Sequence, residues 1–494
     1  MRLAVLALIA AIILGLAVPL INILTAPSLP DADLQTSGSD LGKAGPLAER
    51  LISACAHCHA SEVPPPWYAS LPGIGAMIEL DRSLGLAALT LDGVLDNPAL
   101  PLGEVAEAKL EAVFHTNEMP PARYLLAHWT SRLSREQRRA GLQWIQDLRR
   151  VRRGNVDLAD AFRGEPVLPI PSPAFGDPNK IALGQRLYND VRLSGDRTVS
   201  CATCHELAKG GTDQLPTSKG IRGQLGPINS PTVFNAVFNV RQFWDGRAAD
   251  LQEQAAGPVT NPLEMDASWD QVTTDLSSDP VMVAAFTQVF GDGAVTQERV
   301  TSALAAFEET LLTPGAPFDR YLQGDETAIT AEAQQGYRLF VERGCTSCHL
   351  GPGLGGTHFE KMGRHKDYFA ARGTTITEAD WGRFNATAKE ADRHSFKVPL
   401  LRNLETTFPY LHDAKAPTIE TAIEVMSTYQ LAKPIPAAEQ TLVAAFLRTL
   451  TAPVPPPATD ALPTAESLLD SSGDAAGDAS ADPAMPPLTE EQSE

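Results

Sequence analysis

The chain has 494 residues, enough for several modest domains, and 43% of them are hydrophobic, which supports buried cores. Acidic residues outnumber basic ones by 60 to 40, and the resulting net charge of −20 argues against nucleic acid as a partner. Runs with β-propensity are few and short, so a mainly α-helical fold is expected.

The N-terminus carries a long apolar run, from Leu3 to Ile21, directly after Met1 and Arg2. A secretory signal core spans ~7–15 residues, whereas ~20 residues cross a bilayer. The single arginine predicts a cytoplasmic N-terminus and an exported remainder. Residues 1–24 are therefore predicted to be an N-terminal transmembrane helix, with a long cleaved signal peptide as the alternative. The expected location is the cytoplasmic (inner) membrane, single-pass, with the domains facing the periplasm.

Composition divides the rest of the chain. Residues 25–45 are rich in Pro, Ser, Asp and Gly and are predicted to be a tether. The first domain, 46–163, has a helix beginning at Ser134 with a serine–glutamate start signal and apolar residues Leu142, Ile145 and Leu148 at helical spacing. A proline-rich linker follows it. The remaining segments are a second domain (164–330), a third domain (331–452) and an acidic tail (453–494) that lacks Lys and Arg and is predicted to be disordered.

The second and third domains carry an internal echo. Gly184-Gln-Arg-Leu-Tyr precedes one Cys-x-x-Cys-His motif and Gly336-Tyr-Arg-Leu-Phe precedes the next, and Gly-Gly-Thr follows each motif. A helix leading into the motif and a glycine-rich loop after it suit a small fold that wraps a haem. We therefore expect cytochrome c-type domains in tandem.

All six cysteines belong to three Cys-x-x-Cys-His motifs: Cys55, Cys58 and His59; Cys201, Cys204 and His205; and Cys345, Cys348 and His349. Two thiols at this spacing attach a haem covalently, and the adjacent histidine binds its iron. A zinc ribbon would need a second Cys-x-x-Cys nearby, and none follows any motif. The sequence therefore predicts three covalently bound haem c groups, and such haems are attached outside the bacterial cytoplasm.

The sixth iron ligand decides whether each haem only carries electrons or also reacts. For the first haem, Met119 is held on an extended segment by Pro120. For the third, Met426 ends an amphipathic stretch, although a lone methionine on a helix is more often core than ligand. The competitors for the first haem are His115, His128 and Met77.

The second haem lacks an obvious sixth ligand. No histidine lies between His205 and His349, and the local candidates are Lys219, Met265 and Met282. An iron with an open face can bind a small molecule, so this asymmetry favours catalysis. Polar residues that could serve such a site, among them Gln254 and Glu264, follow the motif, and a core or solvated role is the alternative for each.

From about residue 181 to 451 the chain resembles the bacterial di-haem cytochrome c peroxidases. The matching stretches are residues 201–205, 211–218, 226–235, 242–247, 263–265, 318–322, 397–403 and 409–412, together with Gln254. With the additional N-terminal haem domain and anchor, the whole chain resembles the membrane-anchored tri-haem peroxidases, which accept electrons from quinols.

The resemblance implies roles for individual residues. It implies catalytic roles for Glu264 as acid/base, Gln254 as the peroxide-orienting amide and Trp244 as the bridge between two haems. The implied iron ligands are His205 at the peroxidatic haem and His349 with Met426 at the electron-transferring haem. It also implies a calcium ion held by Asn229 and by the carbonyls of Thr407 and Pro409, and oxygen donors suit that ion.

One departure from the family matters. Many members place a histidine ligand sixteen residues after the proximal histidine, and here that position is Ile221. The second haem is therefore expected to be five-coordinate and active without prior reduction.

The expected function is reduction of hydrogen peroxide to water at the second haem. The two further haems relay electrons from a quinol or from a small cytochrome c or copper protein. The alternatives are a di-haem oxidase of a protein or organic substrate, which would carry Tyr in place of Met426, and a non-catalytic multihaem electron-transfer cytochrome. The oligomeric state stays open, a homodimer included.

Overall fold

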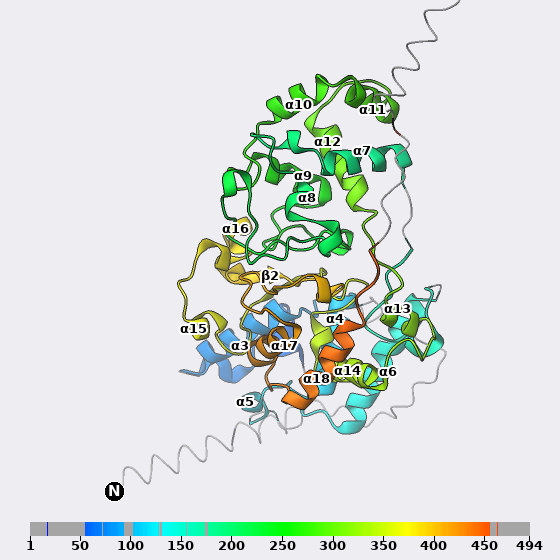
Figure 1. The fold of residues 1–494 in the computed structure, drawn as a ribbon. Coiled ribbons are helices and arrows are strands. Elements are labelled where there is room, and N and C mark those ends of the chain that lie inside the picture. Colours follow the sequence, from blue (N-terminus) through cyan, green and yellow to red (C-terminus); the bar gives the residue numbers. More distant parts are fainter. Residues whose placement is uncertain are drawn as a thin grey trace, which may run out of the picture.

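The computed structural model describes residues 55–71, 73–92, 102–126, 128, 131–154, 156–172 and 176–454, together with Ala17 and Leu462. Over these residues the chain is mainly helical, which confirms the predicted class. The two strands found there, β1 (Phe359–Lys361) and β2 (Ser395–Lys397), pair antiparallel with Phe359 opposite Lys397. The helices form three units, each around its own hydrophobic cluster (Figure 1).

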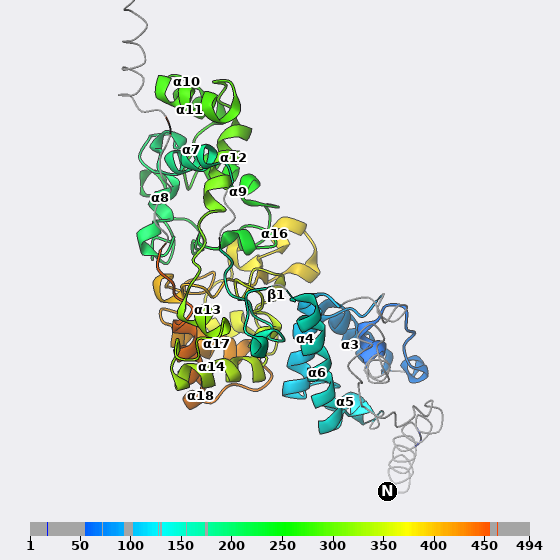
Figure 2. The same ribbon diagram turned by 90° about the vertical axis from the view of Figure 1, so that its right-hand side faces the viewer.

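The first unit flanks the third rather than the second (Figure 2). Its helices are α3 (Gly75–Ala88), α4 (Glu104–Thr116), α5 (Ala122–Leu125) and α6 (Arg135–Arg152). The predicted helix start at Ser134 is confirmed, because its hydroxyl accepts a hydrogen bond from the Gln137 N–H (3.1 Å) while the Gln137 side chain accepts from the Ser134 N–H (2.8 Å). The reciprocal partner is thus a glutamine. Ile145 of α6 is fully buried against α4.

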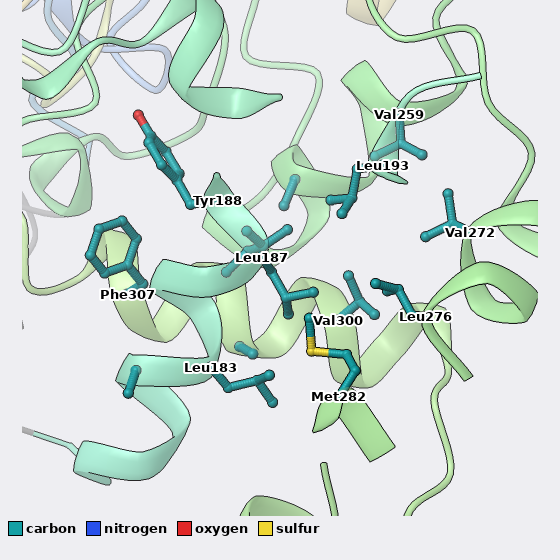
Figure 3. Packing of buried hydrophobic residues seen from close by; sticks show 14 of the residues in the cluster. Leu183, Leu187, Tyr188, Leu193, Val259, Val272, Leu276, Met282, Val300 and Phe307 are labelled. Carbon is teal, nitrogen blue, oxygen red and sulfur yellow. The ribbon is translucent and has the colours of Figure 1, made fainter. Parts of the chain in front are cut away.

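The second unit is an all-helical body at one end of the molecule (Figure 1). Its helices are α7 (Pro178–Tyr188), α8 (Cys201–Cys204), α9 (Leu251–Thr260), α10 (Trp269–Ser277), α11 (Pro280–Phe290) and α12 (Gln297–Glu308). Its core contains Leu183 and Leu187 of α7, Met282 of α11 and Val300 of α12 (Figure 3). The core joins helices on both sides of the attachment motif, so the motif is fixed on a packed scaffold.

The third unit contains both strands and the remaining helices. These helices are α13 (Pro317–Leu322), α14 (Ala331–Glu342), α15 (Tyr368–Arg372), α16 (Phe384–Thr387), α17 (Ile419–Gln430) and α18 (Ala437–Arg448). Its core includes Leu158 and Val167 from the segment that follows the first unit, as well as Phe318 from α13. The short 3₁₀ helices of the three units are Trp67–Ser70, Asp160–Phe162, Val191–Leu193, Leu207–Lys209, Ile221–Gly223, Ala236–Phe238, Cys345–Ser347, Glu378–Trp381, Glu390–Asp392 and Leu404–Thr406.

The sequence echo corresponds to a repeated helix crossing. A Cβ atom added at Gly184 of α7 would lie 1.9 Å from the Ala303 carbonyl oxygen of α12. A Cβ atom added at Gly336 of α14 would lie 1.9 Å from the Leu442 carbonyl oxygen of α18. Each glycine therefore allows a close backbone approach that no other residue permits without displacement.

Helix α4 connects the first unit to the third. It packs on the 3₁₀ helix η8 (Cys345–Ser347), which carries an attachment cysteine. A Cβ at Gly344, just before η8, would lie 3.2 Å from the Ala112 Cβ of α4. Lys109 Nζ of α4 also forms a partly buried ion pair with Glu360 Oε1 at 2.5 Å. The first and third units, each of which carries an attachment motif, are therefore in direct contact.

Three predicted segments lie outside the described residues almost entirely: the anchor 1–24, the tether 25–45 and the tail 453–494. Over the part of the chain that is described, no helix combines the length and apolar character needed to cross a bilayer.

Candidate functional site

The three motif histidines share one hydrogen-bonding arrangement. The Nδ1 atom of each ring pairs with a backbone carbonyl oxygen: His59 with Leu89 (2.9 Å), His205 with Gly211 (3.2 Å) and His349 with Leu354 (3.0 Å). A carbonyl only accepts, so Nδ1 carries the proton and Nε2 keeps a free lone pair. Burial also lowers the pKa of His205, and it lowers that of His349 to about 4, so both rings stay neutral. Neutral, oriented imidazoles of this kind suit iron.

An apolar cavity in the third unit brings together the residues predicted for the third haem. Cys345, Cys348, His349 and Met426 all line it. Met426 belongs to α17, whose N-terminus is capped by the Thr418 side chain, and it forms part of the cavity wall. Tyr429, one turn further, packs edge-on against Tyr368 instead and is not part of this lining.

The same cavity wall holds a buried ammonium group. Lys397 of β2 is 5% exposed, and no hydrogen bond to its Nζ is found among the described residues. Burial lowers its pKa to about 7, and Asp245 opposes this shift only in part. An amine in this setting is suited to an anionic partner such as a porphyrin carboxylate. Its charge, together with the cysteines, histidine and methionine, fits a covalently attached haem.

In the second unit, Ile221 and Glu264 lie side by side. The Ile221 N–H donates to the Glu264 carbonyl oxygen at 2.8 Å, and a Cβ at Gly220 would lie 2.0 Å from the Leu263 carbonyl oxygen. Ile221 itself is fully buried in the core of the second unit. The loop also passes close to the attachment motif, since the Cys204 thiol lies 4.0 Å from the Lys219 carbonyl oxygen. Burial raises the pKa of that thiol to about 11, and the charges of Asp213 and Glu264 add to the increase.

The Glu264 carboxyl is partly buried, and its surroundings act on its pKa in opposite directions. Burial raises its pKa, while the Arg247 charge and a hydrogen bond from Asn261 Nδ2 to Oε1 (2.8 Å) lower it. The net effect raises the pKa of Glu264, which is the direction that suits a carboxyl acting as a general acid–base group. Arg247 itself stacks over the Phe243 ring, 3.5 Å from its centroid.

Trp244 reaches from the second unit into the third. Its indole N–H donates to the Asn229 carbonyl oxygen (2.8 Å), and its own carbonyl accepts from the Lys397 N–H (2.9 Å). Its ring meets Phe396 and His412 edge-on, and it lines the cavity of the third unit. Trp244 is therefore held in the path between the two units. Gln254 lies in the first half of α9, and Glu264 follows the end of that helix; Gln254 is partly exposed.

The three residues predicted to bind calcium also line this cavity. Asn229 directs its Nδ2 atom to the carbonyls of Leu215 (3.2 Å) and Pro216 (3.4 Å), so its Oδ1 points elsewhere. Within the described residues, no hydrogen bond is donated to the carbonyl oxygens of Thr407 or Pro409. Free oxygen donors in one wall fit the donor set of a calcium ion.

The candidates for the remaining iron positions differ in their surroundings. Met265 and Met282 are buried in the core of the second unit, where each fills apolar space. His128 stacks on Tyr124 and its Nε2 is hydrogen-bonded to the Tyr68 hydroxyl. The other candidates are the partly exposed Met119 between α4 and α5, the exposed Met77 on α3, His115 in the last turn of α4, and Lys219 on the Ile221 loop.

Sequence reasoning assigned no role to Arg247, Lys397 or Glu308. Each is a charged residue, and its effect depends on which residues from distant parts of the chain surround it in the fold. Arg247 acts on Glu264 from the other end of α9, and Lys397 and Glu308 are buried although charged residues are usually exposed. A lysine or glutamate inside an otherwise apolar pattern was the available signal.

A helical chain with these attachment motifs and neutral, oriented histidines is by class a c-type cytochrome. Residues 178–327 match the family described as di-haem cytochrome c peroxidase, and residues 31–147 match that described as haem-binding domain. The chain is 43% identical over 426 residues to the cytochrome c peroxidase Ccp of Escherichia coli K12, covering 85% of this chain and 90% of that protein. It is also 43% identical over 309 residues to the cytochrome c551 peroxidase of Nitrosomonas europaea, covering 61% and 91%.

The chain belongs to the di-haem cytochrome c peroxidase family, as its resemblance predicted. It is a haem-binding oxidoreductase that acts on peroxide. Among solved structures, a MauG-like protein associated with microbial copper homeostasis is similar with a TM-score of 0.53 and 26% identity, over 59% of this chain and 97% of that one.

Proposed function

We propose that this protein reduces hydrogen peroxide at a five-coordinate haem attached to Cys201 and Cys204, with Glu264 as the acid/base residue. The supporting observation is the contact between Ile221 and Glu264, in which the Ile221 N–H donates to the Glu264 carbonyl. This hydrogen bond joins the backbones of the two residues, so the loop whose side chain at position 221 cannot bind iron is held next to the segment that carries the Glu264 carboxyl.

The chain's own groups supply the proton chemistry. A haem bound at His205 supplies an iron that coordinates peroxide and exchanges single electrons. Glu264 accepts a proton from one peroxide oxygen and delivers it to the other, so that the O–O bond breaks and water leaves. The Gln254 amide orients the substrate by hydrogen bonding. The complete reaction consumes one peroxide, two protons and two electrons and yields two waters.

The spin state of the oxidised protein tests this proposal. The full-length enzyme as isolated is expected to show high-spin haem by electron paramagnetic resonance and to react with peroxide without prior reduction. Ile221→His should convert this signal to low spin and impose a lag that reduction relieves. Ile221→Val keeps an apolar side chain and should leave both properties unchanged. A wild-type spectrum with only low-spin iron would overturn the five-coordinate assignment.

The electron path is proposed to run from a first haem (Cys55, Cys58, His59 and Met119) to a third (His349 and Met426) and then through Trp244. Helix α4 supports this route, because Cys55 packs against the cluster on one of its faces and η8 packs against another. Trp244, fixed at both its indole and its carbonyl, supports the second half. Stopped-flow reduction of Trp244→Phe should show slower electron arrival at the second haem with unchanged reduction of the first.

The proposed donor is a quinol, with a small cytochrome c or copper protein as the other source of electrons. The apolar segment 1–24 supports a single-pass anchor in the cytoplasmic membrane with the domains in the periplasm. Turnover with a soluble quinol should exceed turnover with reduced cytochrome c. Faster turnover with the protein donor would reject the quinol assignment.

The proposed calcium ion would be held by Asn229 and by the carbonyls of Thr407 and Pro409, which line the cavity beside Trp244. Its charge would stabilise the contact between the second and third units. Chelation should lower turnover and added calcium should restore it. Asn229→Ala should abolish the response to both treatments.

A further inference from the structure

The repeated helix crossing aligns α12 with α18 residue by residue. The carbonyls of Ala303 and Leu442 face the crossing glycines in the same way. This register pairs buried apolar residues of the two helices: Leu304 with Val443, Phe307 with Phe446, and Leu311 with Leu450. One buried position breaks the pattern, because the register pairs Glu308 with Leu447.

The position of Glu308 is the one that faces the haem. In the third unit, Val443 and Leu447 lie one turn apart on α18 and both line the cavity that holds Cys345 and His349. By the same register, Glu308 faces the attachment side of the second unit. Its charge acts on the Cys201 thiol and on the Tyr188 hydroxyl, which places the carboxyl near both.

A second polar exchange accompanies the first. Tyr188 ends α7 at the position that Phe340 holds in α14, and Phe340 lines the cavity of the third unit. The Tyr188 ring lies at the edge of the apolar core with its hydroxyl pointing away (Figure 3). That hydroxyl donates to the His205 carbonyl oxygen at 2.5 Å. Two apolar residues of the third haem site are thus replaced by hydroxyl and carboxyl groups at the second.

Within the described part of the chain, no opposite charge balances Glu308. It is 6% exposed, and among the described residues its carboxyl has neither a hydrogen bond nor an ion pair. Burial alone raises its pKa to about 8. The titratable groups facing it are Tyr188 of α7, whose pKa burial raises well above 10, and the α8 cysteines, which cannot titrate once they are thioethers. On α9, which also packs against α12, the exposed Glu253 accepts from the Ala249 N–H.

We propose that Glu308 is a redox-linked proton-binding group of the second haem. When the iron gains an electron from the reductant, the ionised Glu308 carboxylate takes one proton from solvent, and when the iron is oxidised the proton leaves. The added negative charge is thereby neutralised inside an apolar site, where an uncompensated charge is unfavourable. The inference rests on the proposed function only in attaching a haem at Cys201 and Cys204, and it requires neither Glu264 nor a particular donor.

The test is an equilibrium spectroelectrochemical titration of the full-length holoenzyme between pH 6 and 9, without peroxide. The potential of the second haem should fall with rising pH over part of this range. The slope should approach about 59 mV per tenfold change in proton concentration for a one-electron couple. Glu308→Gln keeps the shape but cannot ionise and should give a flat response. Glu308→Leu reproduces the third-unit residue and should do the same, whereas the exposed neighbour variant Glu309→Gln should behave as wild type.

Infrared difference spectra of the wild-type protein provide a readout that needs no variant. Reduction should produce a protonated-carboxyl band that shifts in deuterium oxide. A flat wild-type potential, a missing carboxyl band, or an undiminished slope in Glu308→Gln would each overturn the proposal. Loss of turnover in Glu264→Gln with an intact pH slope would separate this inference from the catalytic assignment.

Discussion

Helices α7 and α12 of the second unit cross at a glycine as α14 and α18 of the third unit do, yet the two crossings enclose different chemistry. The third unit presents Met426 and Leu447 to its cavity. In the second unit, Ile221 and Glu264 are joined by a backbone hydrogen bond, and Glu308 is buried where the third unit has Leu447. Under the proposed function, one scaffold would hold a six-coordinate iron in the third unit and a five-coordinate iron in the second. The difference comes from a few side chains and not from the helices.

The largest expected effect comes from removing the Glu264 carboxyl. Glu264→Gln keeps the side-chain shape but cannot carry the proton, so turnover should fall about 10²–10⁴-fold. Haem content, measured by pyridine haemochrome, should not change. Glu253→Gln, an exposed variant on neighbouring α9, is the matched control and should retain activity. Normal turnover in Glu264→Gln would remove Glu264 from the mechanism.

The glycine helix crossing that the second and third units share can be disrupted in one unit at a time. Gly184→Ala and Gly336→Ala each place a Cβ 1.9 Å from a carbonyl oxygen, so each should lower the free energy of unfolding by about 1–3 kcal/mol or more. Visible spectra during thermal denaturation should show early loss of the second haem for Gly184→Ala and of the third for Gly336→Ala. Gly176→Ala is the control, because a Cβ there meets nothing within 4 Å. Simultaneous loss of both haems in each variant would contradict the separation into units.

These two predictions also show what the sequence could establish. The six cysteines and the echo around Gly184 and Gly336 were local patterns that predicted haem attachment and tandem domains. The scarcity of β-propensity runs predicted the helical class, and the matching sequence stretches predicted the family. The methionines were harder, because Met282 and Met426 look alike on their helices and only the fold sends one into a core and the other into a cavity.

Charges that act between distant segments were beyond local reasoning. Glu308 lies in a sequence that favours a helix, and the neighbouring residues in the chain do not indicate that α7 and α8 bury its side chain. Arg247 and Glu264 are separated by α9, and their interaction exists only because the chain reverses after that helix. Such residues become visible when a buried charge is compared with its counterpart in the other unit.

The third haem is proposed to have Met426 as its sixth iron ligand. Met426→His keeps two protein ligands on the iron but replaces sulfur by nitrogen, so the potential of the third haem should fall and the methionine-to-iron charge-transfer band should disappear. The second haem should keep its spin state, because its site lies in another unit. Met362→Leu alters the other methionine that lines this cavity and should preserve the band. Persistence of the band in Met426→His would assign the sulfur ligand elsewhere.

The smallest expected effect tests how the Arg247 charge changes the pKa of Glu264. The Arg247 charge lowers the pKa of Glu264 against the raising effect of burial, so Glu264 is ionised, and able to accept a proton, above that pKa. Turnover should therefore fall as pH falls through it. Arg247→Met removes the opposing charge and should move this acid limb to higher pH by about one pH unit or less, since the arginine side chain is half exposed and screened by solvent. Arg247→Lys retains the charge and should leave the limb near its wild-type position, whereas a shift to lower pH in Arg247→Met would show that the limb belongs to another group.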